Sequence, residues 1–171
     1  MEQRKNLRLK GYDYSNSGLY FITICTFGKK CSLSYITDRR DSPCGCPQVI
    51  LTKLGKICKV NLFNIEKLFN IKVINYVIMP NHIHLIIEVK EYNARTGASP
   101  VPTVSAIIGA YKSLVYNKWL DTCGENNQIV GKIWERSFYD HIIRDDEDLY
   151  FRQRYIDENP LRWCMKISKR E

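Results

Sequence analysis

Two of the three histidines in this 171-residue chain, His82 and His84, stand close together in the stretch "MPNHIHLIIEV". Side chains on a β-strand alternate between its two faces, so both histidines and Glu88 would point to the same face. Imidazoles two residues apart can converge on one metal ion, but a hard divalent cation also prefers oxygen ligands. The pair is therefore either half of a metal site or the polar face of a strand, satisfied by water.

A third ligand could come from the stretch "YIDENP", in which Tyr155 and Asn159 are four residues apart. On a helix this spacing places the two residues on the same side, about one turn from each other. Asn159 offers an amide oxygen to a cation, and Tyr155 offers a phenol that can attack a phosphodiester when a metal polarises the phosphate. The alternatives are that Tyr155 packs between helix and sheet and that Asn159, before Pro160, ends the helix.

The apolar pattern predicts the elements that would hold these residues. Runs rich in β-branched and aromatic residues predict strands at 19–27, 71–78, 82–89 and 138–144, with a Pro-Asn turn between the second and third. Helical periodicity predicts helices at 50–69, from Thr103 onward, and from Asp145 to Pro160. Residues 38–48, 90–102 and 121–131 are predicted as loops, and "SLSYI" could extend the sheet.

The order of these elements is strand, helix, strand, strand, helix, strand and a further helix. It predicts an α+β fold, a ferredoxin-like split βαβ antiparallel sheet with two helices on one face and an added C-terminal helix carrying Tyr155. The other face of the sheet would be left for the added helix, a ligand or nucleic acid. We expect a single domain over residues 1–171, with a core at about 18–145 and a C-terminal helix and basic tail at about 146–171.

The net charge is positive, because 26 Lys and Arg against 18 Asp and Glu give +8. This charge suits a polyanionic partner such as nucleic acid, although it can also serve solubility alone. No apolar run is long enough to span a membrane and the first residues are charged, so we expect a cytoplasmic protein without membrane contact. The seven cysteines, Cys44 and Cys46 among them, are odd in number and irregularly spaced, which favours reduced thiols over disulfides.

Three blocks of the sequence, in this order, carry a family resemblance: "MPNHIHLIIEV", "IWERSFYDHIIRDDEDL" and "YIDENPLRW". They resemble the single-tyrosine transposases of the HUH nuclease superfamily, especially the REP-associated tyrosine transposases of insertion-sequence 200 type. The resemblance implies Mg²⁺ or Mn²⁺ held by His82, His84 and Asn159, with Tyr155 as the nucleophile. It also implies that a monomer or homodimer cleaves single-stranded or hairpin DNA through a 5'-phosphotyrosine intermediate and then transfers the strand.

His141, Arg144 and Arg152 are further candidates, as contacts to DNA phosphates. Each also has a structural alternative, either as a hydrogen-bonded strand histidine or as a solvated charge near a helix end. Trp134 and Trp163 are expected to be packing anchors rather than platforms for DNA bases.

Three other function classes fit less of the sequence. A domesticated, non-transposing DNA-binding protein that recognises hairpin repeats is the main alternative, and formation of a covalent DNA adduct separates it from an enzyme. An RNA-binding ferredoxin-like module would carry a glycine-aromatic block that has no match here. An iron oxygenase would pair the two histidines with a carboxylate that the sequence does not identify.

Overall fold

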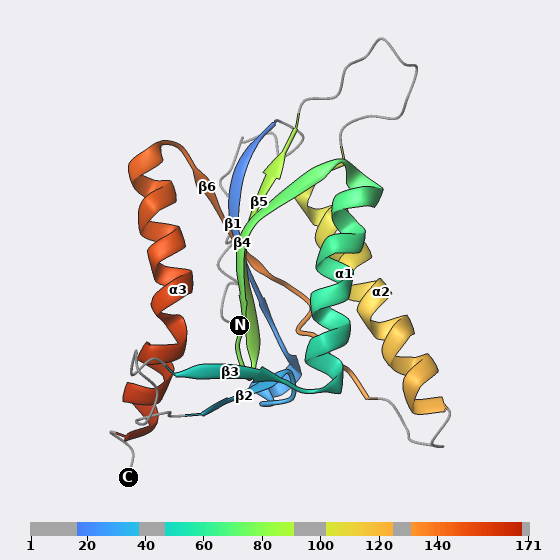
Figure 1. The fold of residues 1–171 in the computed structure, drawn as a ribbon. Helices are drawn as coiled ribbons and strands as arrows, with labels where there is room; N and C mark the ends of the chain where they lie inside the picture. Colours follow the sequence, from blue (N-terminus) through green and yellow to red (C-terminus); the bar gives the residue numbers. More distant parts are fainter. Residues whose placement is uncertain (1–16, 38–46, 91–101, 125–130, 169–171) are drawn as a thin grey trace, which may run out of the picture.

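A four-stranded antiparallel sheet forms the centre of the computed structural model, which describes residues 17–37, 47–90, 102–124 and 131–168. Its strands are β1 (Gly18–Cys25), β4 (Ile71–Ile78), β5 (His82–Val89) and β6 (Tyr139–Ile143), in the order β4-β5-β1-β6. Helices α1 (Lys53–Phe69) and α2 (Val104–Gly124) lie on one side of the sheet, and α3 (Asp146–Ser168) lies on the other (Figure 1). This arrangement confirms the predicted ferredoxin-like fold with an added C-terminal helix.

The main hydrophobic core lies between the sheet and helices α1 and α2. Alternate residues of the two central strands point into it, and the side chains that they contribute are almost fully buried: Tyr20, Ile22, Ile24, Ile83, Leu85, Ile87 and Val89. Each such aliphatic side chain stabilises the fold by about 1.5–3 kcal/mol through burial alone. The strict alternation on β5 is what turns His82 and His84 toward α3.

Two short strands, β2 (Ser34–Thr37) and β3 (Gln48–Leu51), pair only with each other, apart from the main sheet. The expectation that "SLSYI" extends the main sheet is therefore wrong, and so is the helical assignment of Ile50, which lies in β3. Helix α1 begins later because the Thr52 hydroxyl accepts a hydrogen bond from the Gly55 amide and caps it. A Cβ at Gly55 would lie 2.0 Å from the Leu33 carbonyl oxygen, so only glycine fits where this hairpin meets α1.

The last two helices run further than their sequences predict. Helix α2 continues to Gly124, into the predicted polar loop, and α3 continues past Pro160 to Ser168. A proline removes one intrahelical hydrogen bond, but the turn after it stays helical, and Trp163 in that turn lies 6.1 Å from the His82 ring. The prediction that the helix ends at Pro160 is therefore wrong, and so is the alternative in which Asn159 ends it.

The predicted starts of these helices are confirmed by their caps. The Thr103 hydroxyl accepts a hydrogen bond from the Ala106 amide, and an Asp145 carboxylate oxygen accepts one from the Asp148 amide at 2.7 Å. No helix in the described part of the chain is both long and apolar enough to cross a membrane. Cys44 and Cys46 lie outside the described residues, and the five described cysteines are free thiols.

Candidate active site

The site is built on the side of β5 that faces α3. His82 and His84 stand next to each other there, with ring centroids 4.5 Å apart and ring planes at 71°. His84 is only 6% exposed, and the His82 side chain is partly buried. On the opposite side of the strand, Ile83 and Leu85 are fully buried against the α1 and α2 side of the core. The structure therefore places both histidines on one face, as their spacing predicts.

Each histidine has an oxygen partner at its Nδ1 atom. The Asn81 amide oxygen lies 2.6 Å from His82 Nδ1, and since an amide oxygen only accepts, Nδ1 carries the hydrogen. The Thr23 hydroxyl lies 2.8 Å from His84 Nδ1, from the neighbouring position on β1. When both Nδ1 atoms donate, the Nε2 atoms keep their lone pairs. Metal-binding histidines in proteins are typically oriented by such a second partner.

Burial keeps both imidazoles in the form that can bind a cation. It lowers the pKa of His82 to about 4, with the nearby Lys166 charge acting in the same direction and a side-chain hydrogen bond with Asn159 opposing it. Burial also lowers the pKa of His84 to about 3, and the neighbouring His82 adds to the effect. Both rings are therefore neutral near pH 7, and a neutral imidazole is the ligand that a metal requires.

Helix α3 brings Tyr155 and Asn159 to the two histidines. The Tyr155 ring centroid lies 5.1 Å from that of His84, at an interplanar angle of 70°, and the Asn159 side chain lies close enough to His82 to raise its pKa. Asn159 is 7% exposed, whereas Tyr155 is 37% exposed. The helix is held on the sheet by Ile156, which is buried in a second apolar cluster with Phe21. The four residues therefore meet within one chain, with the phenol at the solvent side.

The donor set at this position consists of two imidazoles and one amide oxygen. Within the described residues, no group of three His, Cys, Asp or Glu side chains could hold a metal ion. Two amides contact His82, and since that of Asn81 is hydrogen-bonded at Nδ1, Asn159 is the candidate for a third protein ligand. Glu88, at the far end of β5, lines a shallow groove with Gly18 instead, and the structure does not bring it to the histidines.

His141 and Arg152 lie next to this site but contact a third residue, Asp148. The Asp148 carboxylate lies 2.7 Å from His141 Nε2 and 3.0 Å from Arg152 Nε. Burial raises the pKa of Asp148, but hydrogen bonds from His141 and Arg152 outweigh it, so that its pKa lies below the usual range. Arg144 follows β6 directly and is exposed. Two of the three predicted DNA contacts are thus joined in one cluster, and Arg144 stands outside it.

Sequence reasoning did not identify four residues that shape the site: Phe21, Thr23, Asn81 and Asp148. The Phe21 ring stacks on His84 with centroids 5.3 Å apart, and it also meets the Tyr155 ring edge-on at 5.9 Å. Alternation along β1 could have placed Phe21 and Thr23 on one face. It could not have revealed their histidine neighbour, because this depends on which strand pairs with β1.

The two predicted packing tryptophans lie on opposite sides of the sheet. Trp134 packs partly buried against the main core, with its ring 6.2 Å from that of Tyr111. Trp163 lies on α3, near His82. Trp163 is thus part of the surroundings of the candidate site, and Trp134 is not.

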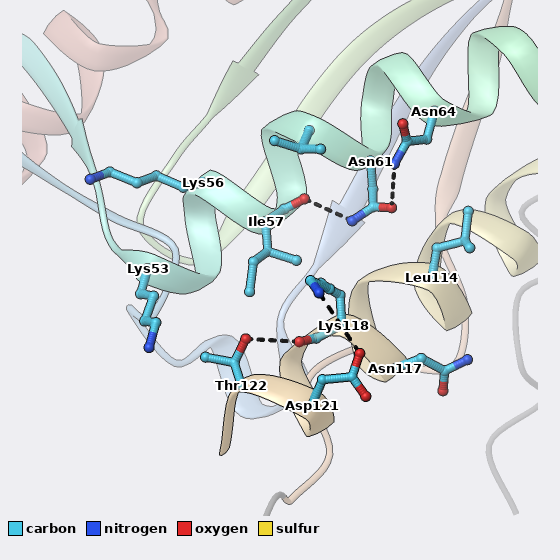
Figure 2. Close-up of a pocket in the computed structure, with 11 residues that line it drawn as sticks. Lys53, Lys56, Ile57, Asn61, Asn64, Leu114, Asn117, Lys118, Asp121 and Thr122 are labelled. Carbon is cyan, nitrogen blue, oxygen red and sulfur yellow. Dashed lines mark hydrogen bonds and ion pairs between the residues drawn. The ribbon is translucent and has the colours of Figure 1, made fainter. Parts of the chain in front are cut away.

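A groove of about 520 Å³ opens between α1 and α2, on the side of the sheet away from α3 (Figure 2). Apolar side chains such as Ile57 and Leu114 line it, together with amides and lysines of both helices. None of the predicted site residues is among its lining residues, so the groove is separate from the candidate active site.

Comparison with known proteins gives concordant matches. Residues 47–159 match the family model described as "Transposase IS200 like". An uncharacterized protein of Haemophilus influenzae is 32% identical, over 95% of this chain and 91% of its own. A second protein of that organism, provisionally named a REP-associated tyrosine transposase, is 28% identical over 88% of this chain and 74% of its own.

Two solved structures share the fold. The structure of a REP-associated tyrosine transposase bound to a REP hairpin superposes with a TM-score of 0.52 at 18% identity, covering 95% of this chain and 74% of that one. A Deinococcus radiodurans R1 protein, provisionally described as a transposase, gives 0.51 at 16% identity, covering 90% and 96%. At these identities the two matches concern the fold alone.

Proposed function

Because the chain belongs to the family of IS200-like transposases, we propose that it cleaves and rejoins single-stranded DNA, with Tyr155 as the nucleophile and a divalent cation held by His82, His84 and Asn159. The membership itself confirms the resemblance drawn from the three sequence blocks. The roles of the individual residues rest on the geometry of the site. The observation that carries them is the meeting of Tyr155 and Asn159 with the two histidines in one chain.

The residues present fit a divalent cation such as Mg²⁺ or Mn²⁺. Two neutral imidazoles, each with an oxygen partner at Nδ1, and one buried amide offer two nitrogens and one oxygen to an ion. Such an ion, when bound, would polarise a phosphate and stabilise the negative charge that develops on it. Water and DNA oxygens would complete its ligands, since hard cations of this kind favour oxygen.

Tyr155 is the group that reacts. Its hydroxyl oxygen attacks the phosphorus of a phosphodiester, and the phenol proton is released as the 5'-phosphotyrosine bond forms. The bond from phosphorus to the 3' oxygen breaks, and this oxygen takes up a proton. A free 3'-hydroxyl leaves, and a second 3'-hydroxyl can reverse the step at a new junction, so no nucleotide hydrolysis is needed. The exposure of Tyr155, at 37%, leaves it accessible to a DNA strand.

Single-stranded DNA next to a hairpin is the proposed substrate. A fold neighbour is described as a REP-associated tyrosine transposase bound to a REP hairpin, and the net charge of +8 suits a polyanion. Since the proposed ligands and nucleophile come from one chain, a monomer holds a complete site, and a homodimer would hold two.

Incubation with end-labelled hairpin DNA and Mn²⁺ tests this proposal. We expect a protein–DNA band that survives denaturing electrophoresis, that disappears when a chelator removes the cation, and that fails to form on blunt duplex DNA. Hairpin binding without any covalent band, in Mg²⁺ as well as Mn²⁺, would instead identify a domesticated DNA-binding protein and contradict the proposed reaction.

A further inference from the structure

Three polar side chains form a cluster beside the candidate site, on the side of the sheet that faces α3. His141 comes from β6, and Asp148 and Arg152 come from the first turns of α3. The Asp148 carboxylate is 2.7 Å from His141 Nε2 through one oxygen and 3.0 Å from Arg152 Nε through the other. All three side chains are partly buried, with 32%, 23% and 32% of their areas exposed in that order.

The hydrogen-bond pattern leaves part of the Arg152 guanidinium unused. An ionised carboxylate only accepts, so the hydrogen in the contact with Asp148 must be on His141 Nε2. Arg152 Nη2, which lies 3.2 Å from that nitrogen, therefore cannot donate to it. Among the described residues, Arg152 then donates through Nε alone. One Nη2–H still points at this nitrogen, because guanidinium hydrogens are fixed in the plane, so three N–H bonds, two on Nη1 and one on Nη2, remain for a ligand.

Arg152 and Tyr155 both contact one aromatic ring, that of Phe21. The guanidinium carbon of Arg152 lies 5.4 Å from the Phe21 ring centroid, and the Tyr155 ring meets the same Phe21 ring at 5.9 Å. The two residues are three apart on α3, which places them on neighbouring parts of one helix face. A phosphate bound at the Tyr155 hydroxyl would therefore lie beside a guanidinium whose Nη groups are available.

We infer that Arg152 binds the DNA phosphate that Tyr155 attacks, and that Asp148 and His141 are positioning residues that hold its guanidinium in place. This inference rests on the proposed function. The planar guanidinium can offer two parallel N–H bonds to phosphate oxygens, and it keeps its charge at every relevant pH. Because Asp148 fixes Nε, the Nη groups are oriented before the DNA arrives, and little conformational freedom is lost on binding.

Another arginine of α3 provides a matched control. Arg154 is also paired with a carboxylate through Nε, that of Glu158, but its side chain is 60% exposed. Glu158 lies on the same helix, and an exposed pair of this kind contributes little to stability. Arg152 and Arg154 thus share residue type, helix and pairing, and differ in their placement relative to Phe21 and Tyr155.

The test is the single-turnover rate of covalent adduct formation at saturating hairpin DNA. We expect Arg152→Ala to lower this rate roughly 100-fold, as when one preorganised donor to a transition state is removed, and Arg154→Ala to change it by no more than about twofold. Asp148→Asn should lower the rate less, by about tenfold, because Arg152 keeps its charge but loses its fixed orientation. Equal rates for the two arginine variants would overturn the inference.

Two further measurements separate a phosphate contact from a purely structural role. Free guanidinium at a non-denaturing concentration should restore part of the rate of Arg152→Ala and have no effect on Arg154→Ala. Arg152→Lys should retain an intermediate rate with the same melting temperature as wild type. Absence of rescue, together with a fall in melting temperature that accounts for the lost rate, would assign Arg152 to stability alone.

The wild-type reaction distinguishes failure of this inference from failure of the proposed function. If wild-type protein forms the adduct and the two arginine variants react alike, only the role of Arg152 is wrong. If wild-type protein forms no adduct with any divalent cation, the proposed function and the role of Arg152 are both wrong.

Discussion

The two faces of the four-stranded sheet are built from the same strands but are covered by different chemistry. Toward α1 and α2, β5 contributes Ile83 and Leu85 to a core of fully buried apolar side chains. Toward α3, the same strand contributes His82 and His84, which contact a hydroxyl, an amide and a phenol. The first face is closed to solvent, and the second keeps an exposed edge at Tyr155. Under the proposed function, the first face serves mainly stability and the second serves the reaction.

The largest expected effect is on the reaction alone. Tyr155→Phe removes the nucleophilic oxygen and should lower adduct formation by about four orders of magnitude or more, while leaving the melting temperature nearly unchanged. Tyr150→Phe, an exposed tyrosine on the same helix, is the matched control and should react like wild type. Denaturing gels measure the adduct. If Tyr155→Phe still forms it, the α3 face does not act through Tyr155.

The next effect is on stability alone. Leu85→Ala, directly after His84 but on the opposite face, should lower the free energy of unfolding by about 2–5 kcal/mol, because it opens a cavity in a fully buried core. Urea denaturation measures this loss. At a temperature where the variant is folded, its rate of adduct formation should match wild type, and a rate that falls in proportion to stability would show that the two faces are not independent.

Acid should destabilise the fold through the two histidines on the α3 face. The pKa values of His82 and His84 are lowered to about 4 and 3 in the folded protein, whereas an unfolded histidine titrates near 6.5. Below pH 6.5 the unfolded chain therefore binds protons that the folded chain excludes, and stability falls as the pH decreases. We expect at most about 2 kcal/mol for each histidine at pH 5, in buffer with a chelator.

The variant His82→Gln/His84→Gln isolates this contribution from that of other titrating groups. Its unfolding free energy should fall less than that of wild type between pH 7 and pH 5. Parallel pH profiles for the two proteins would mean that the histidines are not buried in the neutral form.

The smallest expected effect concerns the support of one ligand. Thr23→Val removes the hydroxyl beside His84 Nδ1 at little change in size, and it should weaken Mn²⁺ binding by about 10- to 100-fold, as for other partners that orient a metal-binding histidine. Calorimetric titration with Mn²⁺ measures this change. Thr37→Val, in the separate two-stranded sheet, is the control. If Thr23→Val binds Mn²⁺ as tightly as wild type, Thr23 does not support His84 as a metal ligand.

Much of this arrangement follows from local sequence pattern. Alternation alone puts His82 and His84 on one strand face, and four-residue spacing alone puts Tyr155 and Asn159 on one side of a helix. The Asp145 cap likewise depends only on residues within one turn. These features could be predicted because each depends on neighbours that are close in the chain.

The features that could not be predicted depend on distant neighbours. Thr23 reaches His84, 61 residues further along the chain, because β1 pairs with β5. The continuation of α3 past Pro160 could not be predicted from neighbouring residues either, because Trp163 and His82 are near each other only in the folded chain. Residues that support a site are thus harder to find by sequence than the residues that form it.

The most direct test of the account is to locate the covalent bond. Wild-type protein would be incubated with hairpin DNA and Mn²⁺, digested with nuclease and protease, and analysed by mass spectrometry. The account predicts a nucleotide attached through a 5'-phosphate to the peptide that contains Tyr155, and to none of the other ten tyrosines. Attachment to another residue, or no attachment while the DNA is cleaved, would contradict it.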